Sequence, residues 1–372
     1  MPLERIDSKK MSYKKWIINV TLIVVAMIVI MCFINYKMDI YNYWKAGEEV
    51  AFRTDTYTRI LKLRHISKNP DKYYGYIIGG SKAGVLDADL ISKYDNGKFY
   101  NVSVPWGCFE DYDAYIQYIA ENTSAKKIIL HLSSIEVLEF SRENMPAVIT
   151  PSKIDDIKEK IKFLIINPVQ IIQDINSEKG YDFVNGGRNY AQQLKEIEEE
   201  GDTYFERSVT TEYDELLDII FNDPKNLIAF NENMEALAHI VQICKENEID
   251  LQVVIGLTFI SELYKFEGDI YWSYLRAIAS LVNYWDFSGF NDVNRNPYNF
   301  INFQHYNYKV GDKMINIMYG KEKMDGFGEY IDPNNFNDYL DRRIGKYSEM
   351  QKEYQETGTI KLFDKTDSSY IE

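Results

Sequence analysis

The sequence predicts an α/β protein with a mainly parallel, doubly wound sheet, preceded by one membrane-spanning helix. Two observations lead to this prediction. From residue 70 onward, short apolar segments typical of buried strands alternate with longer segments of helical periodicity, as in sheets built from strand–helix–strand units. Near the N-terminus, a continuous apolar run is long enough to cross a bilayer.

The composition is that of a globular protein with one large domain or two small ones. Of its 372 residues, 27% are charged and 45% are hydrophobic. A formal net charge of −15 argues against nucleic acid as a partner and against broad adhesion to anionic lipid. The 30 tyrosines fit either a packed core or a carbohydrate-binding cleft.

Residues 17–34 form the predicted transmembrane anchor. This run of 18 residues spans about 27 Å as a helix, and no small-x-small cleavage site follows it. A buried core helix is the alternative, but the run has no polar face. The positive-inside rule then places residues 1–16 in the cytoplasm and the main domain outside, because five basic residues precede the run: Arg5, Lys9, Lys10, Lys14 and Lys15.

After a partly helical connector (residues 35–69), the α/β domain is predicted to cover residues 70–320. Its first half contains three expected strands and two helices. In order, these are strand Tyr73–Gly79, a helix from Lys82 to about Ile91, strand Lys98–Val104, helix Phe109–Asn122 and strand Lys126–Leu132.

A charged, helix-rich insertion (residues 140–223) separates the third strand from the fourth. It contains a turn signal at Asn185-Gly186-Gly187-Arg188, and its most acidic patch is Glu196, Glu198, Glu199 and Glu200. An insertion of this length usually covers an active site or forms a partner surface.

The second half of the domain completes a flavodoxin-like, doubly wound sheet of five parallel strands. Its expected elements are helix Asn231–Asn247, strand Asp250–Leu257, helix Tyr271–Val282, strand Tyr284–Phe287 and helix Val310–Met318. Residues 321–372 are predicted to form a helical segment, with a polar, frayed end from Thr357.

The first strand ends in a candidate nucleophile, Ser81. The stretch Tyr76–Gly84 passes from an apolar strand into two glycines, which permit the positive φ of a tight turn, and then into Ser81 and a helix start. Such a serine would lie at the carboxyl edge of the sheet, beside free helix N–H groups. The alternative is an ordinary strand-to-helix turn with an incidental serine.

A candidate base, His305, lies between the fifth strand and the last helix. In a sheet ordered 2-1-3-4-5, the loops after the first and fifth strands can meet over the carboxyl edge. His305 and Ser81 are therefore expected to approach within hydrogen-bond reach, as a serine nucleophile requires.

Four segments together resemble the SGNH (GDSL-like) hydrolase superfamily. The resemblance covers residues 70 to 345 approximately and is closest to the membrane-anchored, extracytoplasmic proteins of bacterial cell-envelope polymer acylation. The segments are Gly80-Ser81 (first block), Asn101–Gly107 (second block), Leu130–Ser134 (third block) and Asn302–His305 (last block).

The resemblance implies a role for each matching residue. Ser81 would be the nucleophile and His305 its base, with oxyanion donors at Ser81, Gly107 and Ser133. Ser133 stands where the family usually has asparagine, and Asn302 replaces the acid that orients the histidine. The corresponding acid-to-amide change in a serine protease costs about 10⁴ in kcat. Two acids from nearby loops, Asp286 and Asp292, are candidates to supply the missing charge.

The resemblance also implies a function. The chain would be an esterase or O-acyltransferase that moves an acyl group on hydroxyls of a secreted glycan or teichoic-type polymer. It would need no cofactor and would work beside a membrane-bound O-acyltransferase. The alternative is a catalytically inactive scaffold of the same fold that binds such a partner or the polymer.

The remaining histidines and the cysteines receive structural interpretations. His131 is expected to pack within the third strand and His239 to be solvated. His65 is expected on a solvated face of the basic connector, which could alternatively touch lipid headgroups. A Cys108–Cys244 disulfide is possible but disfavoured, and no His/Cys cluster has metal-site spacing.

Overall fold

Six strands form one sheet in the order β10-β7-β6-β3-β1-β2. The computed structural model describes residues 13–45, 57–133, 146–150, 152–176, 180–181, 185–189, 199, 224–302 and 305–372. The strands are β1 (Gly75–Gly79), β2 (Phe99–Asn101), β3 (Lys127–Leu132), β6 (Asp250–Ile255), β7 (Tyr284–Asp286) and β10 (Glu329–Ile331). The five strands from β2 to β7 are parallel to their neighbours, which confirms a mainly parallel α/β sheet.

The predicted strand count was one too low. β10 pairs antiparallel with β7, with Tyr330 opposite Trp285, and extends the sheet beyond the five predicted strands. This segment was predicted to belong to a C-terminal helical region. A strand of three residues that follows a loop with two glycines at positive φ, Gly326 and Gly328, is too short to show a period-two pattern.

The inner strands β1 and β3 are mostly apolar because both faces of the sheet are buried. In β1, Tyr76 and Ile78 belong to one core cluster, and Ile77 belongs to the other. In β3, Ile128 and Leu130 lie in the first cluster. This alternation follows the two-residue period of a strand, so a continuous apolar run fills two cores at once.

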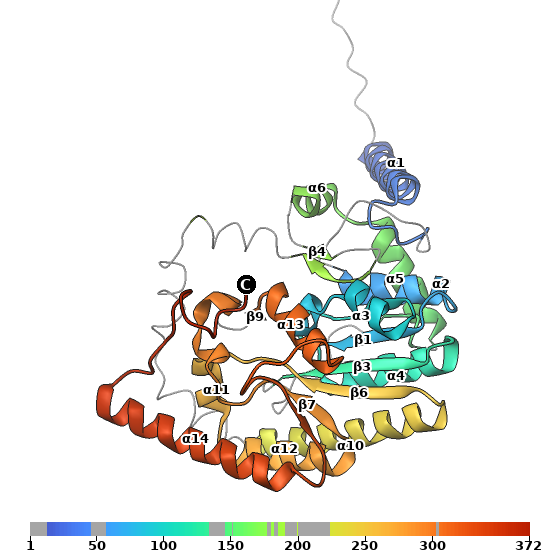
Figure 1. Cartoon of the computed structure of the whole chain (residues 1–372). Helices are drawn as coiled ribbons and strands as arrows, with labels where there is room; N and C mark the ends of the chain where they lie inside the picture. Colours follow the sequence, from blue (N-terminus) through green and yellow to red (C-terminus); the bar gives the residue numbers. More distant parts are fainter. Residues whose placement is uncertain are drawn as a thin grey trace, which may run out of the picture.

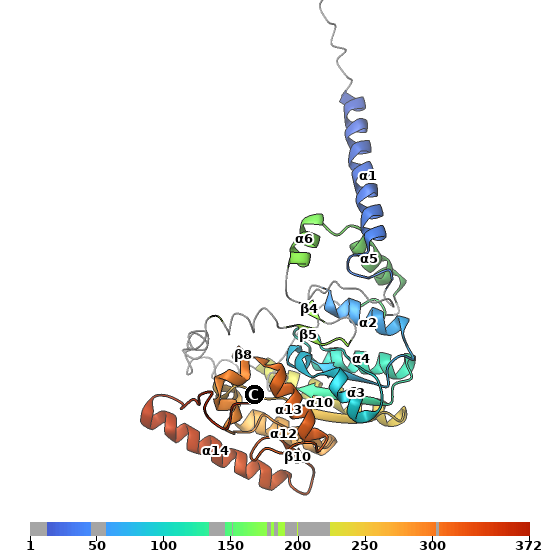
Figure 2. The ribbon, with the colours of Figure 1, turned by 45° about the horizontal axis from the view of Figure 1, so that its top comes forward.

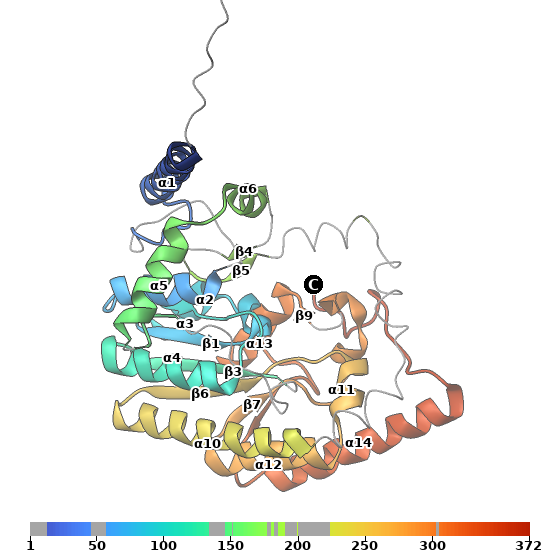
Figure 3. The ribbon, with the colours of Figure 1, turned by 180° about the vertical axis from the view of Figure 1, so that it is seen from behind.

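Helices cover both faces of the sheet (Figures 1 and 3). One core cluster draws on α4, α10 and α12, and the other draws on α3, α11 and α13. The long helix α14 contributes to both. The bounds are α2 (Thr58–Lys68), α3 (Ala88–Asp95), α4 (Phe109–Asn122), α10 (Pro224–Glu246), α11 (Ile260–Phe266), α12 (Asp269–Leu281), α13 (Tyr308–Met318) and α14 (Phe336–Thr357).

The helix predicted directly after Ser81 is two shorter elements. A 3₁₀ turn, η1, covers Ser81–Val85, and α3 begins only at Ala88. Leu86 between them has extended backbone (φ −73°, ψ 118°). Asp87 then caps α3, its carboxylate accepting a 2.8 Å hydrogen bond from the N–H of Asp89. A capping aspartate inside the apolar pattern is the signal that divides the segment.

The N-terminal helix α1 (Tyr13–Met38) stands apart from the α/β domain (Figures 1 and 2). It is the helix in the described part of the chain that is long and apolar enough to cross a membrane. Two helices of the insertion, α5 (Lys153–Leu164) and α6 (Pro168–Asn176), lie beside its C-terminal end. There the amide of Asn35 donates hydrogen bonds to the carbonyls of Leu164 (2.8 Å) and Ile166 (3.0 Å).

Candidate active site

Ser81 and His305 meet at the carboxyl edge of the sheet. The hydroxyl oxygen of Ser81 lies 2.7 Å from Nε2 of His305, although 224 positions separate the two residues. Ser81 opens η1 after β1, and His305 opens the short strand β9 (His305–Tyr306). Both side chains are half-buried. The expected convergence of these two residues is therefore present.

The turn that carries Ser81 depends on space at Gly79. A Cβ at Gly79 would lie 2.7 Å from the carbonyl oxygen of His131 and 2.8 Å from Cβ of Ala83. Only glycine allows η1 to approach β3 this closely. The expectation of a positive-φ glycine is wrong here, because Gly80 adopts φ −71° and Gly79 is not among the positive-φ residues.

The loop that carries His305 is held by buried asparagines. It runs through η3 (Val293–Arg295) and η4 (Pro297–Asn299) into β8 (Phe300–Asn302), which pairs with β9. The amide of Asn299 donates to the carbonyls of Val293 (3.0 Å) and Ser369 (2.8 Å), and its oxygen accepts from the N–H of Ile371 (2.9 Å). Asn296 likewise donates to the Asp364 carbonyl (2.9 Å).

These bonds show that the prediction of a frayed C-terminal end was wrong. Ser369 and Ile371 are buried, and the N–H of Phe363 donates to the carbonyl of Arg295 at 3.0 Å. The segment is ordered because its backbone groups bind asparagine side chains, and not because it packs as an amphipathic helix. Figure 1 accordingly shows the C-terminus beside β9.

His131 connects the sheet to the histidine loop. It is fully buried in β3, as predicted, and its Nε2 lies 2.9 Å from the hydroxyl of Tyr306, the neighbour of His305. Burial, together with the nearby Lys82 ammonium, lowers the pKa of His131 from 6.5 to about 3. The ring is therefore neutral at pH 7. This contact was not predicted, and the only sign of it in the sequence is the tyrosine beside His305.

Gly107 lies directly against the serine turn. A Cβ at this position would be 3.1 Å from Cα of Gly80 and 2.8 Å from the ring of Tyr112. Within the described residues, the Gly107 N–H donates no hydrogen bond, so it is available to a ligand. Ser133, the other expected oxyanion donor, follows β3 at the same edge and is buried.

Trp106, one residue before Gly107, is an exposed aromatic beside the site that the sequence analysis did not single out. Its side chain is 65% exposed, and its backbone has φ +53°, which is costly for a bulky residue. Arg59 holds this turn by donating to the carbonyls of Pro105 (2.8 Å) and Trp106 (3.0 Å). The sequence Pro105-Trp106-Gly107 could have indicated a turn with an exposed aromatic side chain.

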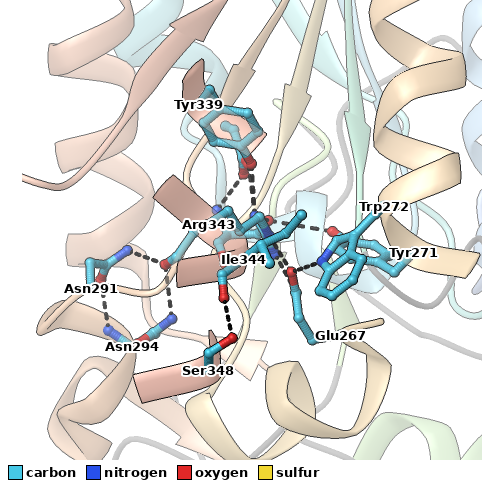
Figure 4. Close-up of polar contacts among 12 residues, drawn as sticks. Glu267, Tyr271, Trp272, Asn291, Asn294, Tyr339, Arg343, Ile344 and Ser348 are labelled. Carbon is cyan, nitrogen blue, oxygen red and sulfur yellow. Dashed lines mark hydrogen bonds and ion pairs between the residues drawn. The ribbon is translucent and has the colours of Figure 1, made fainter. Parts of the chain in front are cut away.

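Neither candidate acid replaces the missing carboxylate. Asp286 accepts hydrogen bonds from the N–H of Ser288 (2.6 Å), from Arg343 (3.0 Å) and from the hydroxyl of Tyr339. It belongs to a buried network in which Arg343 also pairs with Glu267 (Figure 4). Asp292 is exposed, and neither acid contacts His305. The expectation that they supply charge to His305 is therefore wrong.

Asn302 pairs with His305 in the β8–β9 ladder, while its side chain lies outside the described residues. The predicted acidic patch also falls outside them, apart from Glu199. Among the described residues, no group of three or more His, Cys, Asp or Glu side chains could hold a metal ion.

The predicted Asn185–Arg188 turn lies beside the site. It joins β4 (Gly180–Tyr181) to β5 (Arg188–Asn189), and the N–H of Asn101 donates to its Asn185 carbonyl at 2.7 Å. Gly186 has φ +77°, and a Cβ there would lie 2.1 Å from the Asn101 carbonyl. The buried ammonium of Lys62 donates to the Gly186 carbonyl (2.7 Å). This part of the insertion thus docks on the serine side of the sheet.

The other histidines and the cysteines have structural positions. His65 is buried, 2.7 Å from the hydroxyl of Tyr73, so the expected solvated face was wrong. The helix α2 that carries it packs its apolar side into the domain core. His239 is half-exposed and pairs with Asp113 at 2.8 Å, as expected for a solvated side chain. Cys108 and Cys244 are free thiols.

No protein-family model matches this sequence, and no curated protein matches it.

Proposed function

We propose that this chain is a membrane-anchored serine esterase or O-acyltransferase of the SGNH type. The observation that carries the proposal is the 2.7 Å contact between the Ser81 hydroxyl and Nε2 of His305, which has the length required for proton transfer from nucleophile to base. The strand order β2-β1-β3-β6-β7, with Ser81 after the first strand and His305 after the fifth, also supports the SGNH assignment.

The reaction would proceed in two transfers. Ser81 Oγ attacks the acyl carbon of an ester while His305 Nε2 takes the hydroxyl proton. The tetrahedral intermediate collapses, the ester bond breaks, and His305 protonates the leaving alcohol. The acyl-serine is then attacked by water, or by the hydroxyl of an acceptor, whose proton passes to His305; collapse releases the carboxylic acid or the new ester, and Ser81 regains its proton.

The oxyanion that forms in each step would be held by N–H groups at Ser81 and Gly107, with the Ser133 hydroxyl as a third donor. Gly107 is suited to this role because it lies against Gly80 with its N–H unused by described residues. Loss of one such donor typically costs about 10²–10³ in kcat.

The proposed substrate is a secreted glycan or teichoic-type polymer, and the proposed partner is a membrane-bound O-acyltransferase that exports the acyl group. The exposed Trp106 beside Gly107 supports a polymer with sugar rings, since an aromatic face offers apolar contact to a ligand whose polar groups remain in water. An open rim of this kind suits a chain substrate better than a closed pocket does.

The proposed anchor is α1, with its N-terminus in the cytoplasm. Aromatic residues mark both ends of its apolar run: Tyr13 stacks on Trp16, and Tyr36 contacts Trp44 edge-on. Trp16 and Tyr36 are separated by about 30 Å along the helix, which is the thickness of the hydrocarbon core. Aromatic residues at both interfaces are typical of spanning helices.

A scaffold without catalytic activity is the second candidate. It is favoured by Asn302 at the position of the acid, together with the commitment of Asp286 to Arg343. Such a protein would hold the polymer or the acyltransferase at the same surface. If the site is only weakened, Asn302→Asp should raise hydrolysis of a nitrophenyl ester; if the protein is a scaffold, the substitution should have no effect.

The decisive experiment compares Ser81→Ala with the matched control Ser273→Ala, an exposed serine on α12. A fluorophosphonate probe should label the wild type and the control but not Ser81→Ala, and ester hydrolysis should fall by about 10⁴–10⁶. If the wild type resists labelling and Ser81→Ala leaves polymer acylation in cells unchanged, the catalytic proposal is abandoned.

A further inference from the structure

Exposed aliphatic side chains are concentrated in the insertion helices α5 and α6. Among the described residues outside α1, every exposed isoleucine, leucine, valine or methionine lies in this pair or in the elbow between them. Seven such residues occur within residues 154–175: Ile154, Ile157, Ile161, Ile165, Val169, Ile172 and Ile175. A soluble surface does not normally gather apolar side chains in this way.

These residues form one stripe on each helix. Ile154, Ile157 and Ile161 follow the helical repeat along α5, and Ile172 and Ile175 follow it along α6. Other side chains, including Phe163 and Ile171, pack inward. Each helix therefore has two apolar faces, of which only one is used to hold it to the protein.

The inward faces fix both helices to the end of α1. The ring of Phe163 stacks on Tyr43, with centroids 3.9 Å apart, and the Tyr43 hydroxyl donates to Glu159 at 3.0 Å. The Tyr41 hydroxyl donates to Asp174 at 2.6 Å. Together with the two bonds from Asn35, these contacts hold the α5–α6 elbow one residue beyond the apolar run of α1.

The charge of α5 differs from that of the whole chain. Its exposed or half-buried charged residues are four lysines (Lys153, Lys158, Lys160 and Lys162) and two aspartates (Asp155 and Asp156); Glu159 is buried. This helix therefore has an excess of positive charge in a protein of net charge −15. Lysines around an apolar stripe are typical of helices that lie in a bilayer interface.

We propose that α5 and α6 lie in the outer headgroup region of the bilayer as a second membrane contact, with their exposed aliphatic stripes toward the acyl chains. The proposal rests on the membrane anchor proposed above. It is favoured over a protein partner because the stripes continue the lipid-facing surface of α1 at the point where α1 leaves the hydrocarbon. Figure 2 shows α5 and α6 at this end of α1, away from the sheet.

This contact would hold the domain at one height and one orientation above the membrane. A single spanning helix leaves a domain free to rotate about the helix axis, whereas two helices beside it restrict that rotation. The Ser81–His305 site would then face a fixed region near the membrane surface instead of sampling all directions.

Depth-dependent quenching in vesicles of zwitterionic lipid tests the proposal with the full chain. Single cysteines at Ile157 and Ile172 (Ile157→Cys and Ile172→Cys) would carry an environment-sensitive fluorophore in a Cys32→Ser background, because Cys108 and Cys244 are buried. Lipids with a spin label high on the acyl chain should quench both labels to within a factor of about 2 of the quenching that lipids labelled near the chain end give at Val24→Cys, since interfacial helices bury about 5–10 Å deep and Val24 lies near the middle of the apolar run.

Two control positions complete the design. Gln173→Cys, on the polar side of α6, should be quenched less than Ile172→Cys, and Glu349→Cys on α14 should be quenched least. If Val24→Cys is quenched but Ile157→Cys and Ile172→Cys are not, the interfacial contact is wrong and the anchor stands. If Val24→Cys is not quenched, the anchor itself is wrong.

Equal quenching at Glu349→Cys would indicate general adsorption and would also overturn the proposal. The same holds if photocrosslinkers at Ile157 and Ile172 in cells recover one membrane protein while both labels remain unquenched in lipid alone. In that case the stripes form a protein interface and not a lipid one.

Discussion

The two halves of the candidate site are built in different ways. Ser81 follows β1, a fully buried strand inside the sheet, and its turn is fixed by close packing of Gly79 against His131. His305 lies in a loop with almost no regular structure, where the amides of Asn296 and Asn299 bind backbone groups of the C-terminal segment. The first half depends on steric fit, and the second depends on hydrogen bonds between distant parts of the chain.

Because the two halves are held differently, each should lose its geometry through different substitutions. Close packing in a central strand couples to the stability of the entire sheet, whereas a loop held by side-chain amides can lose its geometry while the sheet stays folded. His131 links the halves through Tyr306, so it should affect both.

The largest effect is expected when the chemistry is removed from either half. His305→Gln should lower ester hydrolysis by at least about 10⁴, with little change in the thermal unfolding midpoint, because the ring is half-buried. The double variant with Ser81→Ala should be no slower than either single variant, since the two groups act together. Additive losses in steady-state rates would show that they do not.

Removal of the C-terminal segment should break only the histidine half. A chain that ends at Ile360 loses the partners of Asn296 and Asn299 and should lose about 100-fold in kcat, the cost of a misplaced catalytic group. Its KM and its far-ultraviolet circular dichroism should change little. The single variant Asn299→Ala should give a smaller loss in the same direction, and full activity in both variants would contradict the assigned role of the segment.

Acid should destabilise the link between the halves. His131 has a pKa of about 3 in the folded protein and an ordinary value of 6.5 when exposed. Below pH 6.5 the unfolded chain binds a proton that the folded ring does not. The free energy of unfolding should therefore fall by about 2 kcal/mol between pH 6.5 and pH 4.5 from this group alone.

The variant His131→Gln should reduce this pH dependence, because its side chain does not titrate and can keep a hydrogen bond to Tyr306. The comparison requires thermal or chemical unfolding of the detergent-solubilised chain at pH 7 and pH 4.5. An equal loss of stability in wild type and variant would assign the acid sensitivity to other groups.

The smallest effect is expected from steric pressure on the serine half. Gly79→Ala would place Cβ 2.7 Å from a backbone carbonyl, so it should lower the free energy of unfolding by about 1–3 kcal/mol. The matched control is Gly345→Ala in α14, where a Cβ meets nothing within 4 Å; it should stabilise by about 0.5–1 kcal/mol. Chemical denaturation of the two variants measures the contrast, and equal stabilities would refute it.

The sequence predicts the serine half far better than the histidine half, and the reason is physical. A continuous apolar run predicts a buried strand, so β1, β3 and β6 lie where expected. Helix α4 has the predicted bounds. The loop around His305 has no periodicity. Its order comes from Asn296, Asn299 and residues some 70 positions away, and no local pattern reports such pairing.

The same distinction explains the other errors. β10 is too short for an alternation to appear, and its position depends on β7 as a partner. His65 was placed on a solvated face because its neighbours in sequence are basic, yet Lys62 beside it is also buried and bonded to backbone carbonyls. Charge alone did not reveal that α2 is enclosed.

The sheet ends on both sides in strands of only three residues, β2 and β10. On the β2 side, Asn185 of the insertion already accepts the N–H of Asn101, so part of that border is occupied by the chain itself. Tethered proteins reach high local density in two dimensions, and a long bare border would invite strand exchange between neighbouring copies. The short, partly covered edge strands should therefore limit polymerisation of this protein on the membrane surface where we propose it acts.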